Sequence, residues 1–226
     1  MKQKYQVLAE EYIDHADHLV PITNEDVCDY VAAVTGKPQE AVRMAVNMAM
    51  SRLEKMRTDL FRFRNGVYYR SKETVFGYSP LNPSLVIQKK YITDGEDVIG
   101  YETGPSLLNK AGLTTLVPAY CSVATNKYKG RGSVRDEPIK TIVTKPITEV
   151  TKENYLYLQT LELIALLNRK RTSIQADDPY GIIYEHIKRL GLDAEVLLYY
   201  AGVCGGGKLA DGLTRVYHRG ARNETA

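Results

Sequence analysis

The chain has 226 residues, of which 44% are hydrophobic and 25% are charged, with a formal net charge of +3 at pH 7. These ordinary globular values exclude a disordered chain, and the length suffices for two small domains. No apolar run reaches the ~20 residues of a membrane-spanning helix, and the first 20 residues contain acids, Glu10, Glu11, Asp14 and Asp17, where a secretory signal would be apolar. We therefore expect a two-domain cytoplasmic protein with no membrane partner.

Metal and disulfide chemistry are not indicated by the sequence. Cys28, Cys121 and Cys204 are far apart and lack the paired spacing of zinc sites, so we expect buried thiols. His15 and His18 could share a helix face as metal ligands, but no further ligand of fixed spacing accompanies them. A solvated acidic helix face is the better interpretation, and we expect neither a metal nor a cofactor.

Charge is distributed unevenly along the first third of the chain. Residues 1–36 contain only two basic residues, Lys2 and Lys4, against several acidic ones. The acidic residues are Glu10, Glu11, Asp14, Asp17, Glu25, Asp26 and Asp29. In residues 37–72 basic residues predominate. They are Lys37, Arg43, Arg52, Lys55, Arg57, Arg62, Arg64, Arg70 and Lys72. Such a local basic stretch is typical of a DNA-binding element.

Three helices are predicted in this region. Residues 3–18 form the first, and Pro21 prevents its continuation. Thr23 or Asn24 can cap the second, which Gly36 ends, and Pro38 takes the first position of the third, residues 38–56. The third helix has one apolar stripe that we expect to be buried. The stripe is Val42, Val46, Ala49, Leu53 and Met56.

The opposite face of the third helix is polar, with Arg43, Asn47 and Ser51 pointing outward. Two helices joined by a short glycine-containing turn, the second with outward Arg and Asn, are typical of a helix-turn-helix. Arginine binds guanine edges and asparagine binds adenine edges in the major groove of DNA. The third helix is therefore predicted to be a recognition helix.

A β-hairpin is predicted next, because residues 60–64 and 67–70 read as strands around Asn65-Gly66. A hairpin after a recognition helix is a wing, and alternation places Arg62 and Arg64 on one face. The sequence thus predicts a winged helix-turn-helix over residues 1–72, with a small helical domain and a solvated hairpin as the alternative. The predicted DNA-binding residues are Arg43, Asn47, Ser51, Arg52, Arg62, Arg64 and Arg70.

Residues 73–226 are predicted to form a mixed α/β domain that ends in helices, so the whole chain is α+β. Residues 78–83, rich in proline, are interpreted as a linker or an entry to this domain. A helix is expected near 105–110, strands near 120–124 and 139–143, and helices capped by Thr151 and by Asp178. A basic loop between the strands is either solvated or a second nucleic-acid surface. Its residues are Lys127, Lys129, Arg131 and Arg135.

Several short sequence segments, in the same order along the chain, resemble those of the AbiEi-like antitoxins. These antitoxins belong to bacterial abortive-infection toxin-antitoxin systems of type IV. The segments are the wing ending in GVYYR, then FGYSP, then GYETGPSLLNKAGLTTLVP and ATN, and the resemblance is clearest over residues 100–126. It implies a DNA-binding domain that represses its own promoter and a second domain that counteracts a nucleotidyltransferase-like toxin. Such antitoxins are described as antagonising the toxin without necessarily forming a stable complex with it. The basic loop is then a candidate antitoxin surface.

Two other functions compete with this one. A transcriptional regulator without a toxin partner would use its second domain to sense a ligand or to dimerise. A nucleotide-dependent enzyme would use residues 202–208, which fit G-x-x-x-x-G-K, but Leu209 replaces the Ser or Thr that holds magnesium and only a short tail follows. A glycine-rich turn between helical segments is the better interpretation, and we expect no enzyme activity.

Overall fold

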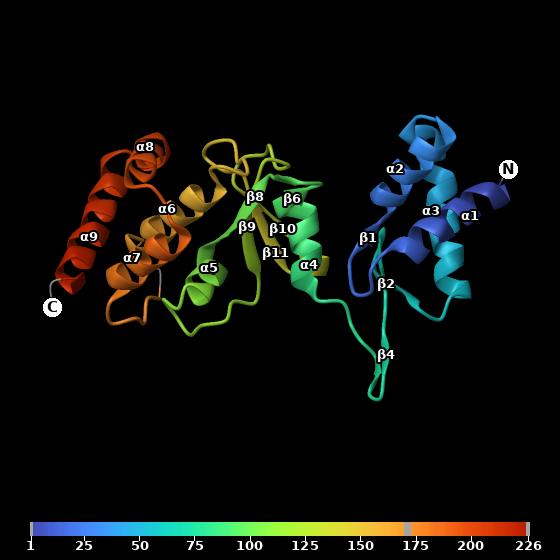
Figure 1. Ribbon diagram of the computed structural model, residues 1–226, viewed down its shortest axis with the longest axis horizontal. Coiled ribbons are helices and arrows are strands. Elements are labelled where there is room, and N and C mark those ends of the chain that lie inside the picture. Colours follow the sequence, from blue (N-terminus) through green and yellow to red (C-terminus); the bar gives the residue numbers. More distant parts are fainter. Residues whose placement is uncertain (1, 170–172, 225–226) are drawn as a thin grey trace. The chain divides into compact units, whose positions relative to one another are not determined.

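The computed structural model describes residues 2–169 and 173–224 and has an α+β fold (Figure 1). The chain separates into two compact units, Met1–Val86 and Ile87–Ala226, called here the first and the second unit. The boundary predicted after Lys72 therefore lies inside the first unit.

Contacts across the predicted linker explain this position of the boundary. The Ser79 amide donates to the Lys72 carbonyl at 3.0 Å, and the Ser71 hydroxyl donates to the Ser79 carbonyl at 2.8 Å. The ring of Tyr78 also lies 4.9 Å from that of Phe61, measured between centroids. The segment after residue 72 thus returns to the preceding hairpin instead of leaving it.

Three helices form most of the first unit. They are α1 (Lys2–His15), α2 (Asn24–Thr35) and α3 (Gln39–Met56). Thr23 caps α2 in a capping box with Asp26, and Gly36 ends it at φ 64°, as predicted. Pro38 is the residue before α3 and not its first residue, because its ψ of 148° is extended.

Strands β1 (Ile22–Thr23), β2 (Leu60–Arg64) and β3 (Val67–Arg70) form an antiparallel sheet in the order β1-β3-β2. The Asn65-Gly66 turn joins β2 to β3, and the predicted hairpin is confirmed. A second hairpin, β4 (Glu73–Thr74) with β5 (Gly77–Tyr78), was not predicted, because its turn lacks the Asn-Gly signal.

The buried stripe of α3 fills the core of the first unit together with residues from α1, α2 and the sheet. Val42, Val46, Ala49 and Leu53 are buried as predicted. Met56 is 70% exposed, so its predicted burial is wrong. It ends the helix, whereas Met50, within the helix, is fully buried.

The second unit contains a four-stranded sheet in the order β10-β11-β9-β8. Its strands are β8 (Gly100–Thr103), β9 (Cys121–Thr125), β10 (Ser133–Asp136) and β11 (Thr141–Thr144). β9 and β11 are parallel, and the other neighbours are antiparallel. α4 (Pro83–Ile87) spans the boundary between the two units, and the second unit continues with a π-helical turn (Gln88–Ile92) and the small hairpin of β6 (Thr93–Asp94) and β7 (Asp97–Val98).

Helices complete the second unit. They are α5 (Gly104–Lys110), α6 (Tyr155–Leu167), α7 (Pro179–Leu190), α8 (Ala194–Gly205) and α9 (Gly207–Glu224). α5 contacts β8 and β9, and α6 lies between β8 and the other helices, which is why both of its sides are apolar (Figure 1). Asp178 caps α7 as predicted, but Asn154, not Thr151, precedes α6.

The glycine-rich segment 202–208 joins two helices, as the preferred interpretation expected. The expectation that only a short tail follows it was wrong, because the 18-residue helix α9 follows. Gly202 lies within α8, Gly206 turns the chain at φ 56°, and Lys208 is in the first turn of α9. Residues 196–200 are helical, so no strand leads into this segment within the described chain. It therefore lacks the strand of a phosphate-binding loop.

Cysteine burial differs from the expectation, because Cys28 is buried while Cys121 and Cys204 are partly exposed. All three are free thiols. No group of three or more candidate metal ligands occurs in the part of the chain that the structure describes. Within the same residues, no helix is long and apolar enough to cross a membrane.

We expect Gly100→Ala to destabilise the second unit by about 1–3 kcal/mol. A Cβ atom there would overlap the Tyr91 carbonyl and lie 2.7 Å from the Ala124 carbonyl. Gly202→Ala, in open space within α8, is the matched control and should instead raise the unfolding free energy by about 0.5–1 kcal/mol, because alanine favours a helix over glycine. Thermal unfolding of the two variants measures the difference, and equal midpoints would contradict the close approach.

Candidate nucleic-acid interface

The outward face of α3 presents Arg43 and Asn47 to solvent, as predicted. Both line a cavity of about 340 Å³ with residues of α2, among them Asn24 and Glu25. The Asn24 side-chain amide donates to Asn47 Oδ1 at 2.7 Å, and Arg43 Nη2 lies 3.4 Å from Gln39 Oε1. The amide and guanidinium groups of α3 are therefore positioned by polar neighbours.

Asn24 is a functional candidate that sequence reasoning missed. It was interpreted as one of two alternative caps of α2, but Thr23 is the cap. This leaves the Asn24 side chain, at the first position of the helix, to reach Asn47 on α3. The signal in the sequence was the pair of adjacent capping residues, of which a helix needs only one.

Arg62 is held against α3 and does not extend freely from the hairpin. Its Nη2 donates to the Ser51 hydroxyl at 3.1 Å and lies 3.8 Å from the Glu54 carboxylate. Its guanidinium carbon is 5.4 Å from the centre of the Tyr68 ring. Since the Arg62 side chain is 37% exposed, it can still meet a phosphate beside α3.

Arg64 lies at the margin of this face, whereas Arg52 lies outside it. Arg52 is exposed and lines a shallow depression with Gln6 of α1, on the side of α3 away from α2. Arg64 is half-buried at the end of β2. The pairing of β2 with β3 shifts between Arg62 and Arg64, so the simple alternation that placed both on one face does not hold.

Arg70 was predicted to contact DNA, and the structure directs its side chain elsewhere. Its Nη1 donates to the carbonyls of Asp14 and Ala16 at 3.0 and 3.1 Å, and its Nε pairs with Asp59 at 3.0 Å. The side chain is only 18% exposed. Arg70 therefore satisfies carbonyl groups at the end of α1, where a cation is favourable, and leaves the candidate interface.

The turn of the predicted wing is short and packed. The backbone N–H of Asn24 donates to the Gly66 carbonyl at 3.0 Å, which places the two-residue turn at the start of α2. Gly66 adopts φ 75°, as the turn requires. Any contact with a nucleic acid at this end would thus involve the turn and the start of α2 together.

The four basic residues of the candidate antitoxin surface are all exposed. Lys127 lies 3.6 Å from the Asp94 carboxylate, and Arg131 follows Gly130 in the turn. Arg135, however, belongs to β10, with its guanidinium 5.3 Å from the Tyr120 ring centre. The surface therefore combines a loop, which includes Lys129, with an edge strand.

A separate cavity of about 670 Å³ lies within the second unit, bounded by its sheet, α5 and α6. Its wall is largely apolar, and the Glu162 carboxylate lies in it. Glu162 Oε1 accepts from the Thr103 hydroxyl at 2.8 Å and lies 3.6 Å from Arg169 Nη2. This size and mixture of groups suit a small ligand.

The structure thus brings Arg43, Asn47, Ser51 and Arg62 together on and beside α3, and moves Arg70 out of the set. Comparisons with known protein families and with curated proteins found no family and no relative that match this chain.

Proposed function

We propose that the protein is a cytoplasmic DNA-binding antitoxin that represses its own promoter and counteracts a nucleotidyltransferase-like toxin. The single observation that carries the DNA-binding part is the element order α1-β1-α2-α3-β2-β3 with sheet order β1-β3-β2. This arrangement is expected of a winged helix-turn-helix, with α3 as recognition helix and β2-β3 as wing. The toxin part rests on the resemblance over residues 100–126.

The chemistry of α3 supports DNA reading within this proposal. Arg43 would donate to a guanine edge, and Asn47 would pair with an adenine edge, with Asn24 fixing its orientation. Arg62 would meet a phosphate beside α3 and supply affinity for any sequence. No catalytic step and no cofactor belong to the proposal.

Antagonism of the toxin is assigned to the second unit, because the antitoxin-like segments lie mainly there. A nucleotidyltransferase that acts on nucleic acid has a polyanionic substrate. Exposed basic residues such as Lys129 and Arg131 could bind that polyanion and shield it. Repression and antagonism would then use different surfaces of the chain.

The full-length chain carrying Arg43→Ala and Asn47→Ala should fail to repress its promoter yet still protect cells from the toxin encoded beside it. Replacing Lys127, Lys129 and Arg131 with serine should have the reverse effect, since exposed loop changes cost only about 0.5 kcal/mol each in stability. A promoter reporter and cell survival measure the two activities. If the loop variant protects fully, that loop is only a solvated surface.

A ligand-sensing transcriptional regulator is the second candidate, and the cavity beside Glu162 favours it. In this case a small molecule bound in the second unit would change the affinity for DNA. The neighbouring gene distinguishes the candidates, because an antitoxin requires a nucleotidyltransferase-like partner beside it. Survival of toxin-expressing cells without the chain would also favour the regulator.

A further inference from the structure

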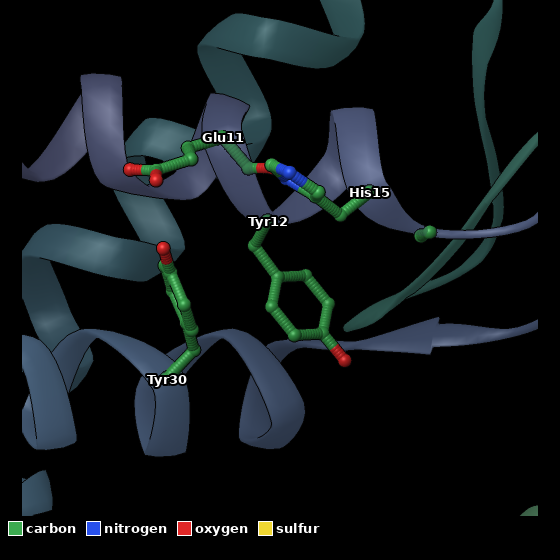
Figure 2. A pocket seen from close by; sticks show the side chains of 5 residues that line it. Glu11, Tyr12, His15 and Tyr30 are labelled. Carbon is green, nitrogen blue, oxygen red and sulfur yellow. The ribbon is translucent and has the colours of Figure 1, made fainter.

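A cleft with aromatic walls lies between α1 and α2 of the first unit, away from the residues assigned to DNA. It has a volume of about 410 Å³ and is lined by Glu11, Tyr12, His15, Ala16 and Tyr30. Figure 2 shows the Tyr12 ring extending from α1 and the Tyr30 ring extending from α2. The ring centroids are 5.5 Å apart and the planes are inclined at 53°, so the rings form adjacent walls. This feature is called the tyrosine cleft.

Carboxylates surround both rings. Partial burial raises the pKa of Tyr30, and the hydrogen bond that its hydroxyl donates to the Glu11 carboxylate raises it further. Burial raises the pKa of Tyr12, and the nearby charges of Asp26 and Asp29 raise it further. Both rings are therefore neutral near pH 7, and the local charge is negative.

Polar groups of the cleft are directed so that they accept hydrogen bonds. His15 Nδ1 donates to the Glu11 carbonyl at 2.7 Å, because a carbonyl can only accept. In a neutral imidazole this leaves Nε2 as an acceptor. The Glu11 side chain is exposed at the edge of the cleft (Figure 2). A bound group with several N–H donors would thus find acceptors around an aromatic surface.

Not every carboxylate on α1 and α2 contributes to this site. Asp14 lies 2.8 Å from Arg57, and Asp26 accepts from the Thr23 amide in the α2 cap. Glu11 lines the cleft and is the carboxylate best placed to meet an incoming cation. The acidic character extends along both helices, which disfavours phosphate and favours a chain with more than one positive charge.

We propose that the tyrosine cleft binds an arginine side chain from a basic segment of a partner protein. A guanidinium group stacks on aromatic rings and donates to carboxylates through a planar fork, which suits the Tyr12 and Tyr30 walls and the Glu11 edge. Charge complementarity selects a basic segment over an acidic or neutral one. The first unit would then bind protein through α1 and α2 while α3 faces DNA.

A hexa-arginine peptide added to the full-length chain tests this inference, with hexaglutamine as the neutral control. Binding is measured by calorimetry and located by nuclear magnetic resonance. Glu11→Gln and Tyr30→Leu should each weaken hexa-arginine binding by about two- to fivefold. Glu185→Gln removes the same charge from an exposed position on α7 and should leave binding unchanged.

Three results would overturn the proposal. One is equal binding of hexa-arginine to the wild type and the two cleft variants. Another is an equal loss in Glu185→Gln, which would mean general charge attraction. The third is self-association of the chain that Tyr30→Leu abolishes, which would make a second copy the occupant. If Tyr30→Leu does not fold, the exposed Glu11→Gln change still decides the outcome.

Discussion

Arg70→Ala should destabilise the first unit by about 3 kcal/mol, although the residue belongs to a strand of the predicted wing. The change removes the donor of two short hydrogen bonds to carbonyls at the end of α1, at 3.0 and 3.1 Å. It also leaves Asp59 without one of its two arginine partners. A partly buried carboxylate and unsatisfied carbonyls are costly, so the effect should exceed that of an exposed arginine.

The same network gives an expected pH dependence. Bonds from Arg57 and then Arg70 lower the pKa of Asp59 to about 2, against an ordinary value of 3.8. Because the folded-state pKa is below the unfolded one, the stabilisation is complete above about pH 4 and is lost as the pH falls toward 2. By linkage it amounts to about 2 kcal/mol at pH 7. Arg70→Ala should therefore lose less stability than the wild type over this acid range.

Hydrogen exchange of the α1 and β3 amides, measured with the full chain, reports the stability of the first unit alone. Arg52→Ala is the matched control, because this arginine is exposed on α3 and should cost less than about 0.5 kcal/mol. A variant Arg70→Ala that keeps wild-type exchange but loses DNA affinity would contradict the structural role. It would restore Arg70 to the DNA-binding set predicted from sequence.

Local signals predicted the first unit well. Thr23, Gly36 and the Asn65-Gly66 turn act within a few residues, so the helix end and the hairpin could be read directly from the sequence. Arg70 could not be placed in this way, because its partners on α1 are more than fifty positions away in the chain. The number of basic and acidic residues in a segment predicts its net charge. It does not predict which arginine side chains pack against the rest of the unit instead of facing solvent.

Long-range pairing limited prediction in the second unit. The parallel contact of β9 with β11 depends on the chain passing through β10, and nothing local in either strand specifies it. Arg135 was therefore placed in a loop, although it lies on β10. The tyrosine cleft was missed for a similar reason, since Tyr12 and Tyr30 belong to different helices and meet only when these pack.

Arg43→Ala and Asn47→Ala should each reduce discrimination between operator and random DNA by about 1–3 kcal/mol, if α3 reads base edges as proposed. Both side chains are exposed, so folding should be unaffected. Asn24→Ala should reduce discrimination at the same base pair as Asn47→Ala but by less. Asn24→Ala removes the 2.7 Å hydrogen bond that orients Asn47. It leaves in place the Asn47 side chain, which is proposed to contact the base.

Arg62→Ala distinguishes contacts with phosphates from contacts with base edges. Since Arg62 lies beside α3 and is bonded to Ser51, it should meet a phosphate and weaken binding to all sequences equally. The slope of log affinity against log salt should fall by about one unit, whereas Arg43→Ala should chiefly change the sequence preference. Titrations of operator and scrambled DNA at several salt concentrations measure both quantities. If Arg43→Ala and Asn47→Ala each lower the affinity for operator and scrambled DNA equally, these residues contact phosphates and not bases. If Arg62→Ala leaves the salt dependence of the affinity unchanged, β2 does not belong to the interface.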